Sequence, residues 1–390
     1  MVIVCQGYGA ASQQNKSTTS CRPVGGLSCS GGSGEKLCPN FNYELLVDGV
    51  EFKDFTSISV NQILSALAAF TLNLGNPEGK NTNRFQQNSE IEFKASWGNR
   101  APETIIKGFV KQRSFQSGVQ RGISLSGIDY GDYMIRSKPW DADFKPLIYN
   151  NEKVSTILSR LISLTPQVKF KITKMSDEPR FDWVTDPTNN SILDEFKAVA
   201  EYGGYEWYIR GDTMYVREPK QLVAGSCTYD LVFGNPDDFA GILPDLPTVI
   251  LLSSNVDEDA GDIKNVYKVV GRDDNTFAIE DNPISIQKYR GRFEGYYQDS
   301  RLTSVQTCSY VAKLLSQLNG VPRLTTGVNY SGNNNVKVGD VVGVGDLYKG
   351  FDPLTSPYVR MASITHNFGI RWDTQAQLGS LVRTLNDLIV

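Results

Sequence analysis

Short runs of alternating apolar and polar residues, separated by turn residues, dominate the sequence from residue 41 onward. The run NYELLV at 42–47 is followed by Asp48-Gly49, a pair typical of tight hairpin turns, and then by VEFKDF at 50–55. Such alternation places one set of side chains on each face of a strand, and the 35 glycines of this 390-residue chain agree with many turns. We therefore predict a first β-domain, a barrel or a sandwich. Its further strands are expected at 69–74, 91–97, 104–115 and 121–130.

The pattern changes near Asn150. Apolar residues at helical spacing predict an amphipathic helix within NEKVSTILSRLISL, ended by Pro166. A second helix is expected from Ser191 to Tyr202, because Ser191 and Asp194 have the spacing of a capping box. The segments YEWYIR and TMYVREP, joined by Gly211-Asp212, then predict a hairpin packed on that helix. Together these segments predict a small α/β domain.

Strand-like sequence returns in the last third of the chain. A Pro- and Asp-rich connector is expected from Asn235 to Asp262, followed by the strand-like runs NVYKVVG and TFAIEDN. A third helix is predicted at 304–318, with Cys308 and Val311 on its apolar face. The last seventy residues read as strands joined by glycine turns. The chain thus reads as β, α/β, β.

Residues 6–40 are rich in Gly, Ser, Asn and Gln and are expected to form an extended arm. The arm region holds four of the six cysteines, in the spacing C-x15-C-x7-C-x8-C, without the C-x2-C pairs typical of zinc sites. Disulfides within the arm or to a neighbouring subunit, free thiols and a metal site all remain open. Cys227 and Cys308 are predicted to be buried apolar residues. The candidate cross-linking residues are Cys5, Cys21, Cys29 and Cys38.

Charge and hydropathy exclude some functions. The chain carries 39 Lys and Arg against 43 Asp and Glu, a net charge of −4 with a pI near 5.3, so nucleic acid is not expected to be its main ligand. No apolar run approaches the ~20 residues that a membrane-spanning helix needs. The apolar start Met1–Cys5 lacks the charged region of a signal peptide, so export is not expected.

The patterns that could indicate chemistry have simpler explanations. His366 is the only histidine and lies in a β-hairpin pattern, which favours a structural role. Arg210-Gly211-Asp212 matches a cell-adhesion tripeptide, but a hairpin turn explains it. The glycines in 339–345 lack the lysine of a phosphate-binding loop. The carboxylates expected in a solvated loop, not in a glycosidase site, are Asp257, Glu258, Asp259 and Asp262.

The order of these segments resembles the central hub proteins of contractile phage tails and related injection systems. The resemblance covers roughly residues 41–385 and rests on SILDEFKAVAEYGGYEWYIRGDTMYVREP, on the later helix QTCSYVAKLLSQL, and on the closing ITHNFGIRWDTQAQL hairpin. It implies a mainly β, α+β fold in which two tube-like β-barrels bracket the α/β domain. The corresponding domains are the arm at 1–40, a first barrel at 41–150, the α/β domain and connector at 151–255, and a second barrel at 256–390 that includes the helix at 304–318.

What the resemblance implies for function is a homotrimeric structural protein of the virion baseplate, assembled in the host cytoplasm. Its partners would be the tail tube or distal tail protein, a three-fold central spike and other baseplate proteins, with DNA only in transit. No cofactor, metal or catalytic residue and no membrane insertion are expected. Two alternatives stay open: a tail-associated enzyme that degrades the cell wall, and a Cys-rich module that binds the host.

Overall fold

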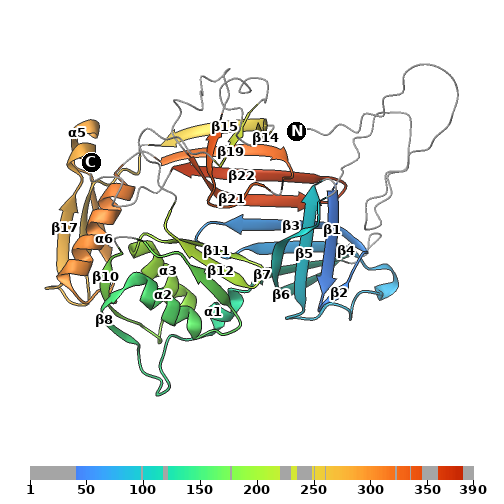
Figure 1. Ribbon diagram of the computed structural model, residues 1–390, viewed down its shortest axis with the longest axis horizontal. Coiled ribbons are helices and arrows are strands. Elements are labelled where there is room, and N and C mark those ends of the chain that lie inside the picture. The colour runs from blue at the N-terminus through green and yellow to red at the C-terminus, as the bar shows by residue number, and fades with distance from the viewer. Residues whose placement is uncertain are drawn as a thin grey trace.

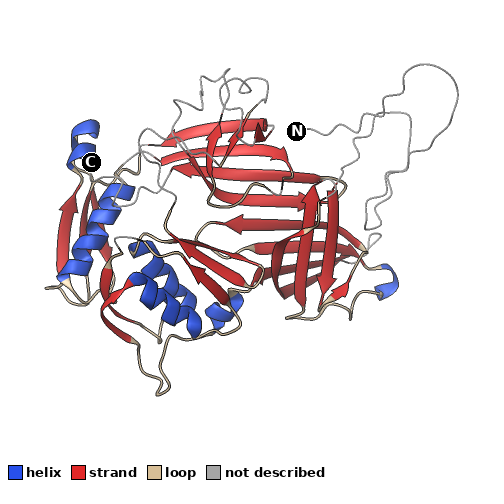
Figure 2. Ribbon diagram, in the orientation of Figure 1, coloured by secondary structure: helices blue, strands red, loops and turns tan. Residues whose placement is uncertain are grey.

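The structure is a computed structural model that describes residues 41–97, 100–116, 122–175, 178–219, 230–234, 248–249, 251–259, 261–320, 323–333, 335–344 and 359–380. The arm expected at 1–40, with its four cysteines, and Cys227 lie outside the described residues. The described chain is mainly β, with its α-helices gathered toward one end and a short 3-10 turn at the other (Figure 2).

The first hairpin forms where the sequence predicts it. Strand β1 (Phe41–Val47) buries every second side chain, and β2 (Val50–Glu51) pairs with it in antiparallel fashion. Asp48 has φ 49° and Gly49 has φ 78°, the two positive values that a tight type I′ turn requires.

Fourteen strands form one continuous sheet rather than two separate ones. Its main path runs β14-β13-β20-β21-β3-β4-β7-β6-β5-β1-β2, and β22, β19 and β15 follow one another from the other side of β21. The sheet curls, so that β1 and β5 stand steeply to β3 and β4 (Figure 1). The bounds are β3 (Phe55–Ile63), β4 (Ala69–Gly75), β5 (Glu90–Trp97), β6 (Glu103–Gln116), β7 (Gly122–Asp129), β13 (Leu231–Phe233), β14 (Thr248–Val249), β15 (Leu251–Asp259), β19 (Arg323–Ser331), β20 (Val341–Val344), β21 (Val359–Phe368) and β22 (Trp372–Ser380), with a 3-10 turn at Pro77–Gly79.

The joint between the first and last thirds of the chain is the pairing of β3 with β21. The two strands are antiparallel, and His366 lies opposite Val60. Each half has its own apolar core on the same side of the sheet. The first core includes Phe70, Leu72 and Phe93, and the second includes Ile364 and Leu378. Two β-rich halves are therefore present, and their strands merge across the β3–β21 joint.

The middle of the chain forms the predicted α/β unit below the sheet (Figure 1). The capping box at Ser191 and Asp194 is present, and helix α3 starts at Ile192, directly after Ser191. The expected hairpin forms β11 and β12, with Gly211 at φ 62° in its turn. Strand β9 extends this hairpin in parallel with β12, and β8 pairs with β10. The bounds are α1 (Asp132–Arg136), β8 (Ile148–Lys153), α2 (Val154–Ser163), β9 (Lys169–Ile172), β10 (Arg180–Val184), α3 (Ile192–Tyr202), β11 (Glu206–Arg210) and β12 (Thr213–Arg217).

A small sheet of order β17-β16-β18 carries helix α6 against it. The apolar face of α6, with Cys308 and Val311, belongs to the same core as Trp183 and Phe196 of the α/β unit. The helix expected at 304–318 therefore forms, but it packs into the α/β core. The bounds are β16 (Val266–Val270), β17 (Phe277–Asp281), α5 (Pro283–Tyr289), β18 (Glu294–Gln298) and α6 (Val305–Leu318).

Candidate assembly site

The centre of one face of the sheet carries neutral polar residues. Across the β3–β21 joint, Thr365 lies beside Asn61, and on its other side it lies beside Gln375. These side chains point away from the apolar cores, because residues of opposite parity on the same strands, such as Val60 and Ile364, are buried there.

The same character extends over eight neighbouring strands, β15-β19-β22-β21-β3-β4-β7-β6. A hollow of about 550 Å³ lies over β3, β15, β19, β21 and β22. We call the following set the neutral face: Ser253, Asn255, Asn329, Gln375, Gln377, Ser363, Thr365, Asn367, Ser57, Ser59, Asn61, Thr71, Asn73, Ser124, Ser126, Gln112 and Ser114.

Hydrogen bonds between strands hold many of these side chains to one another. Ser59 Oγ donates to Asn367 Oδ1 at 2.8 Å across the β3–β21 joint. Thr365 Oγ1 donates to Asn61 Oδ1 at 3.2 Å across the same joint. At the far end, Asn329 Nδ2 donates to the Ser253 hydroxyl at 2.7 Å. The face is therefore organised by its own side chains.

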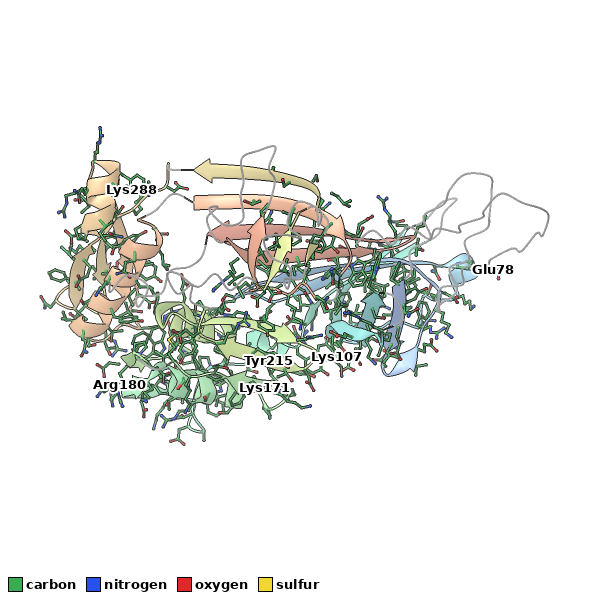
Figure 3. All side chains as sticks on the ribbon, turned by 45° about the horizontal axis from the view of Figure 1, so that its top comes forward. Glu78, Lys107, Lys171, Arg180, Tyr215 and Lys288 are labelled. Carbon is green, nitrogen blue, oxygen red and sulfur yellow. The ribbon has the colours of Figure 1, made fainter. Side chains whose placement is uncertain are left out.

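Charged pairs begin where the sheet curls away from the neutral face. Lys94 on β5 lies 3.1 Å from Glu44 and 3.8 Å from Glu92. Lys107 (labelled in Figure 3), on the half of β6 that pairs with β5, lies 3.2 Å from Glu90. The outward residues thus change from ion pairs to neutral amides and hydroxyls within β6.

A buried ion cluster fixes the α/β hairpin to the second half of the sheet. Glu206 on β11 accepts a hydrogen bond from Arg217 Nε at 2.6 Å, and its other oxygen pairs with Arg360 on β21. Arg217 also donates to the carbonyl of Gly339 at 3.1 Å. Arg360 and Glu206 are both almost fully buried, so these charges balance one another away from water.

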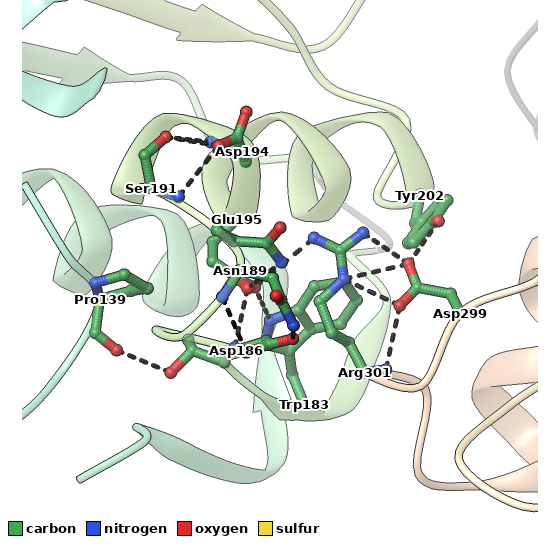
Figure 4. A network of polar contacts seen from close by, with 12 residues as sticks. Pro139, Trp183, Asp186, Asn189, Ser191, Asp194, Glu195, Tyr202, Asp299 and Arg301 are labelled. Atoms are coloured by element: carbon green, nitrogen blue, oxygen red, sulfur yellow. Dashed lines mark hydrogen bonds and ion pairs between the residues drawn. The ribbon is translucent and has the colours of Figure 1, made fainter. Parts of the chain in front are cut away.

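A second polar cluster joins α3 to the segment before α6 (Figure 4). Arg301 forms a forked pair with Asp299 and lies 3.8 Å from Glu195, which is completely buried. Glu195 also accepts a hydrogen bond from Trp183 Nε1 at 2.9 Å. Burial raises the pKa of Glu195, against hydrogen bonds and the Arg301 charge that lower it. The cluster supports packing between segments about a hundred residues apart.

The structure has clear counterparts among solved proteins. A tail protein from Neisseria meningitidis MC58 superposes with a TM-score of 0.64 at 12% identity, covering 89% of this chain and 99% of that one. The 43 kDa tail protein of prophage MuSo2 from Shewanella oneidensis gives 0.60 at 13% identity, covering 87% and 98%. The chain has the fold of phage tail proteins. No family model matches the sequence, and no curated protein matches it.

This tail-protein fold extends beyond phages. A component of the type VI secretion system of E. coli, described as structurally similar to T4 bacteriophage tail proteins, gives a TM-score of 0.53 at 11% identity, covering 88% of this chain and 77% of that one. The resemblance drawn from the order of segments is therefore confirmed in the fold. Among the described helices of the tail-protein fold, none has the length and apolarity needed to cross a membrane.

In the tail-protein fold, His366 is a buried residue on the core side of the β3–β21 joint, opposite to the neutral face. Its Nδ1 accepts a hydrogen bond from Trp372 Nε1 at 3.2 Å and lies 3.2 Å from Thr374 Oγ1. Complete burial lowers its pKa to about 3, so the imidazole is neutral at pH 7. The adjoining cavity of about 60 Å³, next to Tyr208 and Ile105, has room for a few water molecules at most.

The expected position of the acidic residues near 260 is wrong. Asp257, Glu258 and Asp259 belong to strand β15 and pair with β19, instead of lying in a solvated connector. Only Asp262 lies in a turn. Within the part of the chain that the structure describes, no three His, Cys, Asp or Glu residues are grouped as a metal site would require.

The remaining sequence patterns are explained by local structure. Arg210 and Asp212 flank the glycine of the β11–β12 turn, where Arg210 pairs with Glu103 and Asp212 lies 2.7 Å from Lys169. Gly339, at φ 83°, precedes β20 and donates its N–H to the carbonyl of Met361. These positions serve turns and strand pairing.

Cys308 is a buried free thiol on α6. Burial raises its pKa to about 11, so it is a thiol and not a thiolate at pH 7. The four cysteines of the arm lie outside the described residues, and their chemistry stays a prediction. The neutral face was also not predicted, although alternating Ser, Thr and Asn in FTSISVNQI and AFTLNL carry its signal.

Proposed function

We propose that this chain is a structural protein of a phage tail baseplate and that three copies form its hub. The observation that carries the proposal is the β3–β21 joint, which places the two β halves side by side with one shared polar face. Tail proteins with the same fold support the assignment to a tail. In this proposal the protein resides in the virion, after assembly in the host cytoplasm.

The strand count supports a three-fold ring with six similar parts. The first half supplies β3, β4, β7 and β6 to the eight-strand stretch, and the second supplies β21, β22, β19 and β15. Every neighbouring pair in the stretch is antiparallel. Three copies would present six four-stranded units, which matches a six-fold tail tube on one side and a three-fold spike on the other.

The ends of the stretch supply the joints between copies. In the described residues, β15 pairs only with β19, and β6 beyond Val110 pairs only with β7. We propose that these two ends of the described stretch meet a strand of a neighbouring copy through backbone hydrogen bonds. Because the two ends differ, pairing β15 of one copy with β6 of the next is a head-to-tail contact, and in our proposal a rotation of one third of a turn at each contact closes three copies into a ring.

The domain division is part of the proposal. We take 41–150 as the first tube-like barrel, 151–255 as the α/β insert and connector, and 256–390 as the second barrel. The packing of α6 in the α/β core indicates that the helix at 304–318 functions with the insert. The partners in this proposal are the tail tube or distal tail protein, the spike and other baseplate proteins, with DNA in transit.

The oligomeric state tests the hub directly. We expect light scattering of the purified protein at rising concentration to give three times the chain mass, and electron microscopy to show a ring with an open channel. A stable monomer at all concentrations, with single copies in intact particles, would falsify the trimer.

A matched pair of variants tests the proposed joint. Phe115 lies in the edge half of β6 with half of its surface exposed, and Phe144 is more exposed on a loop of the α/β unit. We expect Phe115→Glu to raise the concentration at which the trimer dissociates at least ~10-fold, because a buried charge at an interface is costly. Phe144→Glu should leave the mass unchanged. Equal masses for both variants and the unmodified trimer would place the joint elsewhere.

For the arm, we propose that Cys5, Cys21, Cys29 and Cys38 form disulfides that strap a neighbouring subunit or partner. An arm of this composition has little apolar surface to bury, so covalent links would hold it in place. Diagonal gels of intact particles, with and without reductant, should show a cross-linked species that contains this chain. Absence of any such species would refute the strap.

A further inference from the structure

Charged side chains are unevenly distributed over the outward side of the sheet. The formation of the individual strands does not require this distribution. Ion pairs cover the outward side of β1, β5 and the first half of β6, through Lys94 and Lys107. From Gln112 onward the same strand carries Gln112 and Ser114, and the neutral face begins. The change coincides with the point at which β6 leaves β5 and pairs with β7.

The neutral face also has few exceptions. At one rim, Asp373 faces the same way and lies 2.6 Å from Arg371 in the β21–β22 turn. At the other end of β21, Arg360 is buried against Glu206. Charged residues make up 21% of the chain, and solvent-exposed surfaces normally carry more than their share of them. On β15, Asp257 and Asp259 follow Ser253 and Asn255 at the same parity and lie opposite Thr325 and Arg323, so the charged positions of the described strands lie at the rims of this face and its centre is neutral.

The polar groups of the face are also partly satisfied within it. Cross-strand hydrogen bonds pair Ser59 with Asn367 and Thr365 with Asn61. Asn73 Nδ2 likewise donates to Ser57 Oγ at 3.1 Å. Groups already bonded to one another offer less to a ligand, while the remaining amides and hydroxyls keep the surface wet.

We propose that the neutral face lines the central channel and is a non-adhesive passage surface for double-stranded DNA. Binding to DNA comes mainly from Lys and Arg that neutralise phosphates and release counterions, and a face without them gains nothing from that source. A face of carboxylates would instead repel the phosphates. A neutral hydrated face neither attracts nor repels the phosphates, so DNA slides along it without salt-dependent binding.

DNA is the occupant that this chemistry fits best. A lining without charge changes binding most for a cargo of uniform charge, such as DNA. A protein of mixed charges would make both favourable and unfavourable contacts on a lining of any charge. The overall charge of −4 agrees, because the chain as a whole has no positive net charge that would attract DNA. The inference rests on the proposed trimeric ring, which supplies the channel.

Two double variants with the same change in charge test it. Gln375→Lys with Gln377→Lys adds two exposed cations per copy on the neutral face, and Gln87→Lys with Gln298→Lys adds two exposed cations outside it. Binding of a short fluorescent DNA duplex would be measured by anisotropy over a range of salt concentrations. The mass of each sample would be measured by light scattering.

We expect no binding by the unmodified protein and tight, salt-dependent binding by the face variant. Six cations converging in one ring would give a log–log salt slope approaching about −5, and the control variant should show no more than about −1 to −2. The affinity of the face variant should exceed that of the control at least ~10-fold at low salt.

Equal binding by the two double variants in a confirmed trimer would overturn the inference and leave the hub intact. Salt-dependent binding by the unmodified trimer would also overturn it. Binding of an unstructured fluorescent polypeptide by the unmodified trimer would assign the channel to protein cargo instead. If the samples are monomeric, it is the proposed ring that fails, and the mass measurement shows this separately.

Discussion

Glu206 on β11 and Arg360 on β21 form an ion pair although 154 residues separate them, and both side chains are almost fully buried. Arg217 shares the same carboxylate from the second strand of the hairpin. This cluster ties the α/β unit to the second half of the sheet, so it couples the stability of the two parts.

Removing the carboxylate should cost more than removing one of its cations. Glu206→Gln removes the carboxylate charge that the buried or half-buried guanidinium groups of Arg217 and Arg360 share, and we expect a loss of about 3–5 kcal/mol in the free energy of unfolding. Arg360→Met should cost less, since Glu206 keeps Arg217. Urea unfolding measures both. Glu51→Gln, which breaks an exposed pair with Lys53, is the control and should change stability by less than about 1 kcal/mol. Equal losses at Glu206 and Arg360 would contradict this ranking.

The buried imidazole of His366 should make the protein sensitive to mild acid. Its pKa is lowered to about 3 in the folded chain, below the ~6.5 of an exposed histidine, so the unfolded chain binds an extra proton between these values. Its contribution to stability is complete above about pH 6.5 and falls by up to about 1.4 kcal/mol per unit as the pH drops toward 3. We expect His366→Gln to be less stable at pH 7 but to lose less between pH 7 and 5. Parallel urea midpoints for the two proteins would refute the assignment.

Gly332 lets the end of β19 pass against the indole of Trp372. A Cβ at this position would lie 2.0 Å from the ring, and the Gly332 N–H donates to the Trp372 carbonyl at 3.0 Å. Gly332→Ala should displace the indole and cost about 1–3 kcal/mol. Thermal unfolding and tryptophan fluorescence would both report the change. Gly75→Ala, whose nearest neighbour would be 3.9 Å away, is the control, and a similar effect at both sites would disprove the steric explanation.

The capping box of α3 should contribute measurably to stability. Ser191 Oγ accepts the Asp194 N–H at 3.2 Å, and Asp194 accepts the Ser191 N–H at 2.9 Å. Ser191→Ala should cost about 1 kcal/mol in the free energy of unfolding, because an N–H at the helix start loses its partner. Ser163→Ala at the exposed C-terminal end of α2 is the matched control. No difference between the two alanine variants in urea unfolding would show that the box adds nothing.

The capping box also makes the stability of the protein depend on pH, through the carboxylate of Asp194. Burial would raise the pKa of Asp194, but hydrogen bonds from Ser191 outweigh it and lower the pKa. The contribution of Asp194 is therefore present above the ordinary value of about 3.9 and is lost as the pH falls through its lower folded pKa. The free energy of unfolding that Ser191→Ala removes should accordingly be smaller near pH 2 than at pH 7. A constant difference would argue against the charged hydrogen bond.

Local signals explain which elements could be predicted. The Asp48-Gly49 and Gly211 turns, the capping box at Ser191 and the apolar faces of α2, α3 and α6 depend on residues within one or two turns of each other. Strand β3 carries such a signal too, with Ile58 and Val60 alternating with Ser57 and Ser59, although the strands expected from the sequence do not include it. Strand β15 carried less, because its acidic end resembles a loop and its pairing with β19 decides its structure.

The sequence by itself determined the local elements, the order β, α/β, β and the small negative net charge, since periodicity and turns act over short distances and composition needs no folding. Only the tertiary structure decided that β3 pairs with β21, that α6 belongs to the α/β core, and that Glu206 meets Arg360. These contacts join residues more than a hundred positions apart, and strand pairing or ion pairing at that range depends on how the whole chain packs. The neutral face exists only because that packing aligns eight strands that no local pattern brings together.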